Sequence, residues 1–386
     1  MPIAPSPPES ARRSALAVGT LFFVNGLTFS NWLPRIPEVR DRLGISNGGL
    51  GTALIGGGLG GLIGSLIVGR VLARWRSRSV LVVAASLLAA LLPLIAFVPT
   101  AITLTLVLTC LGFLDVFNDM SMNTQGMMIE TRLGRSIINR LHGMWSLGFM
   151  LGALIGLGAS AVKLDIRVHL TVVGMLMLGT VVAVQGRLLA IDNPPTPGDE
   201  HGRRQMSVMV VSMAVMAIGV GWLEIIPGDW SAVLFRDVFD AGRWSGLGTV
   251  SFAFAMLVGR MSGDHVLERI GGRRMLTGAI ALVVVGTVVV VAAAAAPVAV
   301  IGLVLWGLGT SVMFPQLYAT AATLKGVSAG AGLGAMGVGQ RLGFMLAPVC
   351  VGALADLQTL RTAIAVLIAV ATVTIIATRR LVQSPV

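Results

Sequence analysis

A few ionisable residues interrupt long apolar stretches of this sequence. Asp115, Asp119 and Asn123 follow one another at steps of four, and Glu224 and Arg341 stand within apolar stretches of their own. Residues four apart lie on one face of a helix. A charge in hydrocarbon costs at least about 2.5 kcal/mol on insertion scales, so each residue is a functional candidate. We expect Asp119, Glu224 or Asp115 to bind and release a proton, with a structural ion pair to Arg341 as the alternative.

The rest of the chain is too apolar for a water-soluble domain. Of 386 residues, 55% are hydrophobic and 12% are charged, whereas soluble domains contain about 25% charged residues. About 20 mostly apolar residues cross a bilayer as a helix. The sequence therefore predicts an all-α integral membrane protein with twelve transmembrane helices. They span residues 14–33, 48–69, 80–98, 101–125, 142–162, 168–189, 206–227, 245–262, 275–296, 298–323, 331–355 and 360–378.

The basic residues indicate the orientation of these helices. Most of the 28 Lys and Arg residues fall in segments on one side of the membrane if the N-terminus is cytoplasmic. Because cytoplasmic loops are enriched in Lys and Arg, we expect both termini in the cytoplasm. The same bias explains the net charge of +11 without a nucleic-acid partner. The two cysteines have no C-x-x-C partner, so no disulfide framework, metal site or cofactor is expected.

The chain divides near its middle. Residues 191–205 read IDNPPTPGDEHGRRQ and form a Pro-, Gly- and charge-rich linker. We expect a six-helix bundle over residues 1–190, a cytoplasmic linker, and a second six-helix bundle over residues 206–386.

Short sequence motifs recur in the two halves in the same order. Arg40-Asp41 recurs as Arg236-Asp237, and a Leu-Gly-Thr at Leu50 recurs at Leu247. Parallel six-helix repeats are a transporter architecture, with the solute site between the repeats near the bilayer midplane.

Two segments, one from each half, carry a family resemblance. GRVLARWRSR from Gly69 and GRMSGDHVLERIGGRR from Gly259 resemble the loop signature of the major facilitator superfamily. The resemblance implies a charge latch at the cytoplasmic ends of the helices, closed while the central cavity faces outward. Ala73 stands where the family usually has Asp, so Glu130 is the expected partner of the first cluster. The expected latch residues are Arg74, Arg78, Glu130, Asp264, Glu268 and Arg269.

A longer segment resembles a bacterial branch of that superfamily more narrowly. It runs from Asp119 to Gly148 and is accompanied by Gly-Asp-Trp-Ser from Gly228. This resemblance implies a multi-pass protein of the bacterial inner membrane that transports a sugar-like or opine-like solute.

In the superfamily, spans 1, 4, 7 and 10 line the central cavity. Amides donate and accept hydrogen bonds without a fixed charge, and Trp offers a flat stacking surface. The side chains on these spans therefore suit a small polar solute with an apolar ring face, although Trp32 and Trp230 also fit membrane-interface anchors. The expected substrate-binding residues are Asn25, Asn118, Asn123, Gln125, Trp222, Glu224, Trp306, Gln316 and Tyr318.

Glycines predict where the two halves meet. Small residues let membrane helices approach closely, so we expect spans 2, 5, 8 and 11 to meet through glycines such as Gly152 and Gly334.

The sequence thus favours a monomeric, proton-coupled transporter of a small polar solute, embedded in the lipid bilayer. Proton-driven efflux of a drug or metabolite is the alternative, weakened because span 5 lacks the proline of drug antiporters. His142 and Ser146 miss the G-x-S-x-G motif, so no catalytic residue is expected. A channel fits poorly with two repeated halves around buried acids.

Overall fold

In a computed structural model of the chain, residues 9–190, 208–322 and 327–383 are described, and these residues form helices without a strand. The helices before residue 191, here called the first half, are α1 (Glu9–Ser30), α2 (Ile36–Leu43), α3 (Asn47–Arg74), α4 (Ser77–Leu91), α5 (Ala101–Leu133), α6 (Ile138–Ala161) and α7 (Ile166–Val184). Those after residue 207, the second half, are α8 (Val208–Asp237), α9 (Leu247–Ile270), α10 (Gly272–Ala292), α11 (Ala296–Thr310), α12 (Met313–Ala322), α13 (Ala329–Leu357) and α14 (Leu360–Gln383). Short 3₁₀ helices are η1 (Leu33–Arg35), η2 (Leu92–Ala96), η3 (Gln185–Arg187) and η4 (Gly242–Trp244).

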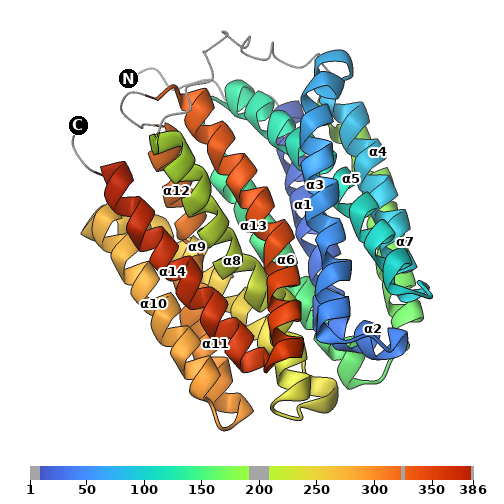
Figure 1. Cartoon of the computed structure of the whole chain (residues 1–386). Helices are drawn as coiled ribbons and strands as arrows, with labels where there is room; N and C mark the ends of the chain where they lie inside the picture. Colours follow the sequence, from blue (N-terminus) through green and yellow to red (C-terminus); the bar gives the residue numbers. More distant parts are fainter. Residues whose placement is uncertain (1–8, 191–207, 323–326, 384–386) are drawn as a thin grey trace.

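Figure 1 shows long helices running side by side between two ends of the molecule. We call the end where α1 begins the Glu9 end, and the opposite end the α2 end. Ten described helical segments are long and apolar enough to cross a membrane. The predicted spans 245–262 and 360–378 overlap α9 and α14. The molecule is therefore a multi-pass helical membrane protein.

Local sequence explains where several helices begin and end. Thr100 forms a reciprocal capping box with Thr103 at the start of α5, and Ser46 caps α3 by accepting a hydrogen bond from the Gly49 amide. Both satisfy backbone donors that a helix start leaves free. Gly134 ends α5 in the left-handed region, with φ of 62°, where a side chain would be strained.

The two segments that resemble the superfamily loops are mostly helical. α3 continues to Arg74 and α9 continues to Ile270. The segment from Gly259 that resembles a loop is therefore helical as far as Ile270, and Arg260 lies within α9.

Glycines let helices of the same half approach closely. A Cβ on Gly60 of α3 would overlap the Thr109 carbonyl of α5, and one on Gly152 of α6 would overlap Ser30 of α1. The prediction that Gly152 joins the two halves is therefore wrong. Its neighbours belong to α1, because α6 uses its glycine face within the first half.

The two halves meet chiefly along α3 with α13 and along α6 with α9. Gly51 of α3 lies against the Pro348 carbonyl, and Gly58 lies against Met345. Gly334 occupies the same face of α13 two turns before Arg341, yet a Cβ there would have no neighbour within 4 Å. The seam between α3 and α13 is therefore closed toward the α2 end and open toward the Glu9 end.

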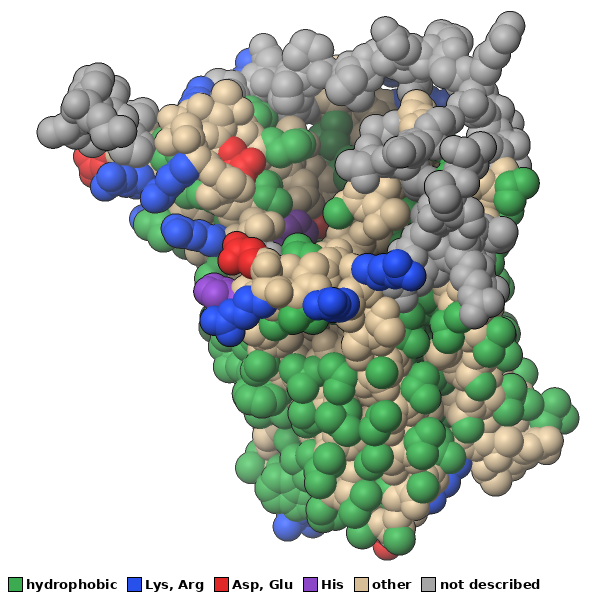
Figure 2. Space-filling view, turned by 90° about the vertical axis from the view of Figure 1, so that its left-hand side faces the viewer, with side chains coloured by type: hydrophobic (Ala, Val, Ile, Leu, Met, Phe, Trp, Pro, Cys, Tyr) green, Lys and Arg blue, Asp and Glu red, His purple; other side chains and the backbone are tan. Residues whose placement is uncertain are grey.

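The exterior agrees with a membrane environment. Figure 2 shows hydrophobic side chains covering one flank, with charged side chains gathered above and below them. Above this band, toward the Glu9 end, the surface is hollowed. A wide apolar flank of this kind suits lipid, because exposed apolar surface in water is unfavourable.

Candidate functional site: the interface between the halves

A chain of polar contacts begins in the first half, near the middle of the helices. Asn25 of α1 donates from Nδ2 to Asp115 of α5 at 2.8 Å. Trp145 of α6 donates from Nε1 to Asn25 Oδ1, also at 2.8 Å. The Trp145 ring stacks on Phe149, with centroids 5.3 Å apart. Three helices thus place an acid, an amide and an aromatic surface together.

The chain of contacts continues into the second half through Arg260. Its guanidinium lies over the Trp145 ring, 5.4 Å from the centroid, and donates to Ser146 Oγ at 3.2 Å. Its other terminal nitrogen forms an ion pair with Glu224 of α8 at 3.1 Å. A cation above an aromatic face is stabilised by the ring's charge distribution. Arg260 therefore connects both halves at the centre of the interface.

A second acid stands one turn along α5 from Asp115. Asp119 accepts a hydrogen bond from Asn123 Nδ2 at 3.0 Å and is half-buried. Arg341 of α13 interacts electrostatically with both acids. It forms no ion pair with the residues that the structure describes, so the alternative of a direct clamp on Asp119 is not seen in this state.

Other expected site residues lie near this centre. Tyr318 donates to Gln340 Oε1 at 2.7 Å and interacts electrostatically with Asp119, Glu224 and Arg341. Among the buried side-chain atoms that have no hydrogen-bond partner in the described part of the chain, three belong to expected site residues: Asn118 Oδ1, Trp222 Nε1 and Glu224 Oε2. Unsatisfied buried polar atoms are costly, so these three are available to a ligand or to another conformation.

Three expected binding residues are engaged elsewhere. Gln125 bonds the Ser77 hydroxyl and the Leu189 backbone, which ties α5 to α4 and to the end of the first half. Trp306 donates to the Leu223 carbonyl at 2.9 Å, and Gln316 lies beside Gly272. We leave these three out of the candidate site.

Two tryptophans expected as interface anchors are core residues instead. Trp32 and Trp230 are 4% and 0% exposed. Their rings fill space between helices, so the interpretation as membrane-interface anchors is wrong.

The expected latch at the Glu9 end is not assembled in this structure. Glu130 instead caps α6, accepting hydrogen bonds from the Ser136 hydroxyl and from the amides of Ile137 and Ile138. Arg74, Glu268 and Arg269 are exposed and Arg78 is half-buried; within the described part of the chain no ion pair joins any of them across the interface. The side chain of Asp264 lies outside the described residues.

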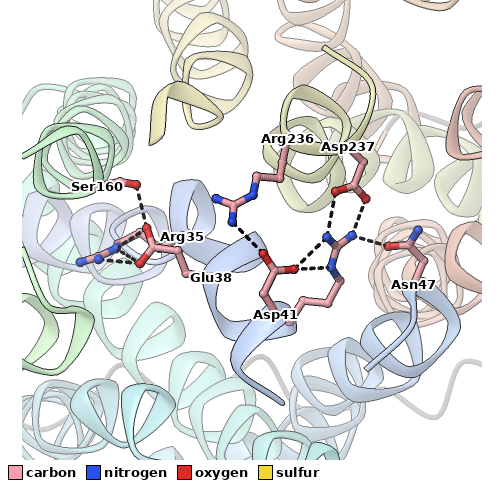
Figure 3. Close-up of polar contacts among 8 residues, drawn as sticks. Arg35, Glu38, Asp41, Asn47, Ser160, Arg236 and Asp237 are labelled. Carbon is pink, nitrogen blue, oxygen red and sulfur yellow. Dashed lines mark hydrogen bonds and ion pairs between the residues drawn. The ribbon is translucent and has the colours of Figure 1, made fainter. Parts of the chain in front are cut away.

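The opposite, α2 end is closed by ion pairs between the halves (Figure 3). Arg40 binds Asp237 through two contacts of 2.5 and 2.8 Å. Arg236 binds Asp41 at 2.9 Å. The two recurring Arg-Asp motifs of the sequence are therefore paired crosswise, each Arg with the Asp of the other half. The internal repeat indicated that the two motifs occupy equivalent positions, but it did not predict that their side chains form ion pairs with each other.

Further contacts hold the closed end in register. Arg40 also donates to Asn47 Oδ1 at 2.9 Å. Asp356, at the end of α13, accepts hydrogen bonds from the Ser46 hydroxyl at 2.6 Å and the Gly48 amide at 3.0 Å. The second half thus contributes an acid to the start of α3, where a negative charge is favourable.

The helix that presents Arg40 and Asp41 is itself anchored to the first half. Arg35 is 3% exposed and pairs with Glu38 at 2.6 Å, and it donates to the Leu164 carbonyl at 2.6 Å. Glu38 accepts a hydrogen bond from Ser160 at 2.7 Å. η1 and α2 are therefore tied to the end of α6 and to the segment before α7, and the ion pairs of α2 with Arg236 and Asp237 join it to the second half.

Known proteins resemble the chain over most of its length. No family model matches it. An uncharacterized MFS-type (major facilitator) transporter of Yersinia pestis is 27% identical over 348 residues, covering 89% of each chain. The uncharacterized transporter y4wD of Sinorhizobium fredii is 29% identical and covers 88% of this chain and 90% of its own. The membrane protein MosC of Rhizobium meliloti is 26% identical, with coverage of 92% and 86%.

Solved structures share the fold. The nucleoside transporter NupG superposes with a TM-score of 0.75 at 15% identity, covering 96% of this chain and 99% of its own. A bacterial homolog of the human lysosomal transporter Spinster, in an inward-facing and unoccupied conformation, gives 0.72 at 12% identity, covering 98% and 100%. The chain is thus similar over most of its length to transporters of the major facilitator type, and it shares the fold of solved transporters.

This similarity changes how the polar interface is interpreted. The relatives and the structural neighbours are transporters rather than enzymes. Polar and charged side chains between the halves of a major facilitator transporter are accordingly candidates for binding solute and for coupling. Sequence reasoning had not selected Trp145, Ser146, Arg260 or Gln340. An Arg within the apolar stretch of a predicted span was the available signal for Arg260.

Proposed function

We propose that this chain is a major facilitator transporter that moves a small polar, sugar-like organic solute across a bacterial cytoplasmic membrane by alternating access, coupled to protons. The crosswise pairing of Arg40 with Asp237 and of Arg236 with Asp41 carries the proposal. It closes one end of the interface between the halves, while the α3–α13 seam is open at the other end. Closure at one end only is what alternating access requires.

The topology that we propose has twelve transmembrane helices in two six-helix units, residues 1–190 and 206–386, joined by a cytoplasmic linker. With both termini in the cytoplasm, the α2 end faces outward. The structure then represents the inward-open state. The latch of Arg74, Arg78, Glu130, Asp264, Glu268 and Arg269 would assemble only when the halves rock to the outward-open state.

The solute would bind where the two halves contribute polar groups to one centre. Asn25, Asp115 and Trp145 form the first-half wall, and Glu224 and Arg260 form the second-half wall. The stacked Trp145 and Phe149 rings offer an apolar surface to one face of a ring-shaped solute. Asp119 is the proposed proton-coupling residue, with Asp115 and Glu224 as its competitors.

The proposal is tested with the purified protein by screening chemical classes of solute. A thermal-shift screen with sugars, polyols, nucleosides, amino acids and drugs selects candidates, because a bound solute raises apparent stability. Labelled candidates are then tested for uptake into proteoliposomes. Direction and coupling follow from imposing a solute or pH gradient in either orientation.

Cysteine labelling provides a second, solute-independent readout. Leu157 is 6% exposed and faces Gly246 across the α6–α9 seam at the α2 end, whereas Gly334 has open space beside it. In a background lacking Cys110 and Cys350, cysteines at positions 157 and 334 should label reciprocally as the transporter changes state. Labelling that never becomes reciprocal, together with no uptake of any solute, would contradict the proposal.

Two glycine substitutions should separate folding from movement. Gly152→Leu forces a side chain into Ser30 and the Leu27 carbonyl of α1, so the first half should be destabilised by several kcal/mol, about the cost of overpacking a core. Gly334→Leu meets nothing here and should insert and fold normally, but it should slow transport by obstructing closure at the Glu9 end. Thermal unfolding and uptake distinguish the two variants. Wild-type uptake by Gly334→Leu would argue against closure at this seam.

A further inference from the structure

Arg341 is a cation near the centre of the molecule that has no counter-ion in contact among the described residues. Its side chain donates to the Gly337 carbonyl of its own helix at 3.5 Å, which is at the long limit for a hydrogen bond. It forms no ion pair with residues 9–190, 208–322 or 327–383. The side chain is half-buried. A charged residue at membrane depth normally pairs or contacts a pathway for ions or solutes.

The position of Arg341 on α13 places it at the bottom of the open seam. Met345 and Pro348 follow it by one and two turns on the same face, and both lie against glycines of α3. Gly334, two turns in the other direction on that face, has open space beside it. Arg341 therefore lies between the glycine contacts that α13 makes with α3 and the open space beside Gly334.

Two carboxylates of the first half lie within electrostatic range of Arg341. Asp115 and Asp119 of α5 and Tyr318 of α12 all interact electrostatically with Arg341, yet neither acid contacts it. Both acids take hydrogen bonds from amides of the first half, Asn25 and Asn123. Arg260, the other cation of the centre, is already paired with Glu224. Arg341 is thus the cation left for an anionic group of the solute.

We propose that Arg341 recognises a carboxylate on the transported solute. The inference rests on the proposed function and names the chemical class of its substrate. A guanidinium presents two parallel N–H donors that match a carboxylate. A monoanion suits the site better than a phosphate ester, because Asp115, Asp119 and Glu224 already supply negative charge around Arg341, a cation without an ion-pair partner among the described residues. The polar remainder of the solute faces the Asp115 and Asn25 wall.

Matched solute pairs test the inference in the full-length protein in lipid nanodiscs. The probes are glucuronate with glucose, galacturonate with galactose, lactate with lactamide, and N-acetylated amino acids with their amides, plus glucose 6-phosphate. Carboxylates should raise the melting temperature and protect Arg341 from phenylglyoxal, as measured by mass spectrometry. Their neutral partners should do neither. Equal effects of neutral partners, an effect of the phosphate ester alone, or no effect of any carboxylate would overturn the inference.

Variants separate solute recognition from a counter-ion role. Arg341→Gln should weaken binding of the best carboxylate about 30-fold or more, because the anion loses a desolvated partner. Arg341→Lys should restore part of it as a point charge, and the exposed control Arg140→Gln should bind like wild type. If Arg341 only balances Asp119, then Asp119→Asn in the Arg341→Gln background should restore binding, and this result would refute carboxylate recognition. Uptake of a neutral solute that survives Arg341→Gln would leave the proposed transport function intact while excluding the carboxylate.

Discussion

Substituting Asp119 by Asn should abolish uphill accumulation of the solute while leaving solute exchange close to wild type. In hydrocarbon a carboxylic acid favours its neutral form, and wetting favours the carboxylate. Asp119 is half-buried between the halves, so its solvent contact should change as they rock. Asn keeps the shape and a hydrogen-bonding group but mimics the protonated state permanently. The variant can still bind and exchange solute. It cannot couple the return of the transporter to the binding or release of a proton at this position.

The size of the effect follows from the gradient. One pH unit corresponds to about 1.4 kcal/mol per proton, so one coupled proton supports roughly tenfold accumulation. With the membrane potential held at zero, wild-type proteoliposomes should approach this ratio, and Asp119→Asn should remain near equal concentrations. Thermal stability serves as the control. Gradient-driven accumulation that persists in Asp119→Asn would remove Asp119 from coupling, and Asp115→Asn and Glu224→Gln would then be compared in the same assay.

The fold was accessible from the sequence because membrane helices leave a direct signal. Ten apolar segments of sufficient length stand in the expected order, and the step of four from Asp115 to Asp119 does place both acids on α5. Hydrocarbon requires each crossing segment to satisfy its own backbone, so local composition reveals the element.

The contacts at the interface were less accessible, for physical reasons that differ between residues. Arg260 has an apolar sequence before it and a basic segment after it, so its role as the partner of Glu224 depends on how α8 and α9 pack. Gly152 and Gly334 have the same local pattern, but one packs on α1 and the other faces a gap. Sequence periodicity identifies a helix face that consists of small residues. Which neighbour that face meets depends on the arrangement and state of the whole bundle.

Reversing the charge of Arg40 should shift the transporter toward the state that is open at the α2 end. Arg40 is 12% exposed and makes two contacts with Asp237 and one ion pair with Asp41. Arg40→Glu would replace these attractions with repulsion between carboxylates. Exposed pairs contribute about 0.2–1 kcal/mol and buried ones several times more when broken. A shift of roughly 2 kcal/mol, or about 30-fold in the ratio of the two states, is expected for this partly buried group.

The crosswise arrangement supplies the decisive control, because each pair can be restored by exchanging its charges. Arg40→Asp with Asp237→Arg should return labelling of a cysteine at position 157 toward wild type, and Asp41→Arg with Arg236→Asp should do the same at the equivalent pair. The exposed pair of Arg13 with Glu9 lies within α1 alone, so Arg13→Glu should leave labelling unchanged. If single reversals at Arg40 and Arg236 leave position 157 protected, the ion pairs do not hold this end closed. The glycine contacts of α3 with α13 are then sufficient to close it. If the single variants expose position 157 and the charge exchanges protect it again, the recurring Arg-Asp motifs act as a symmetric gate. Each half then supplies one Arg and one Asp that pair with the Asp and the Arg of the other half.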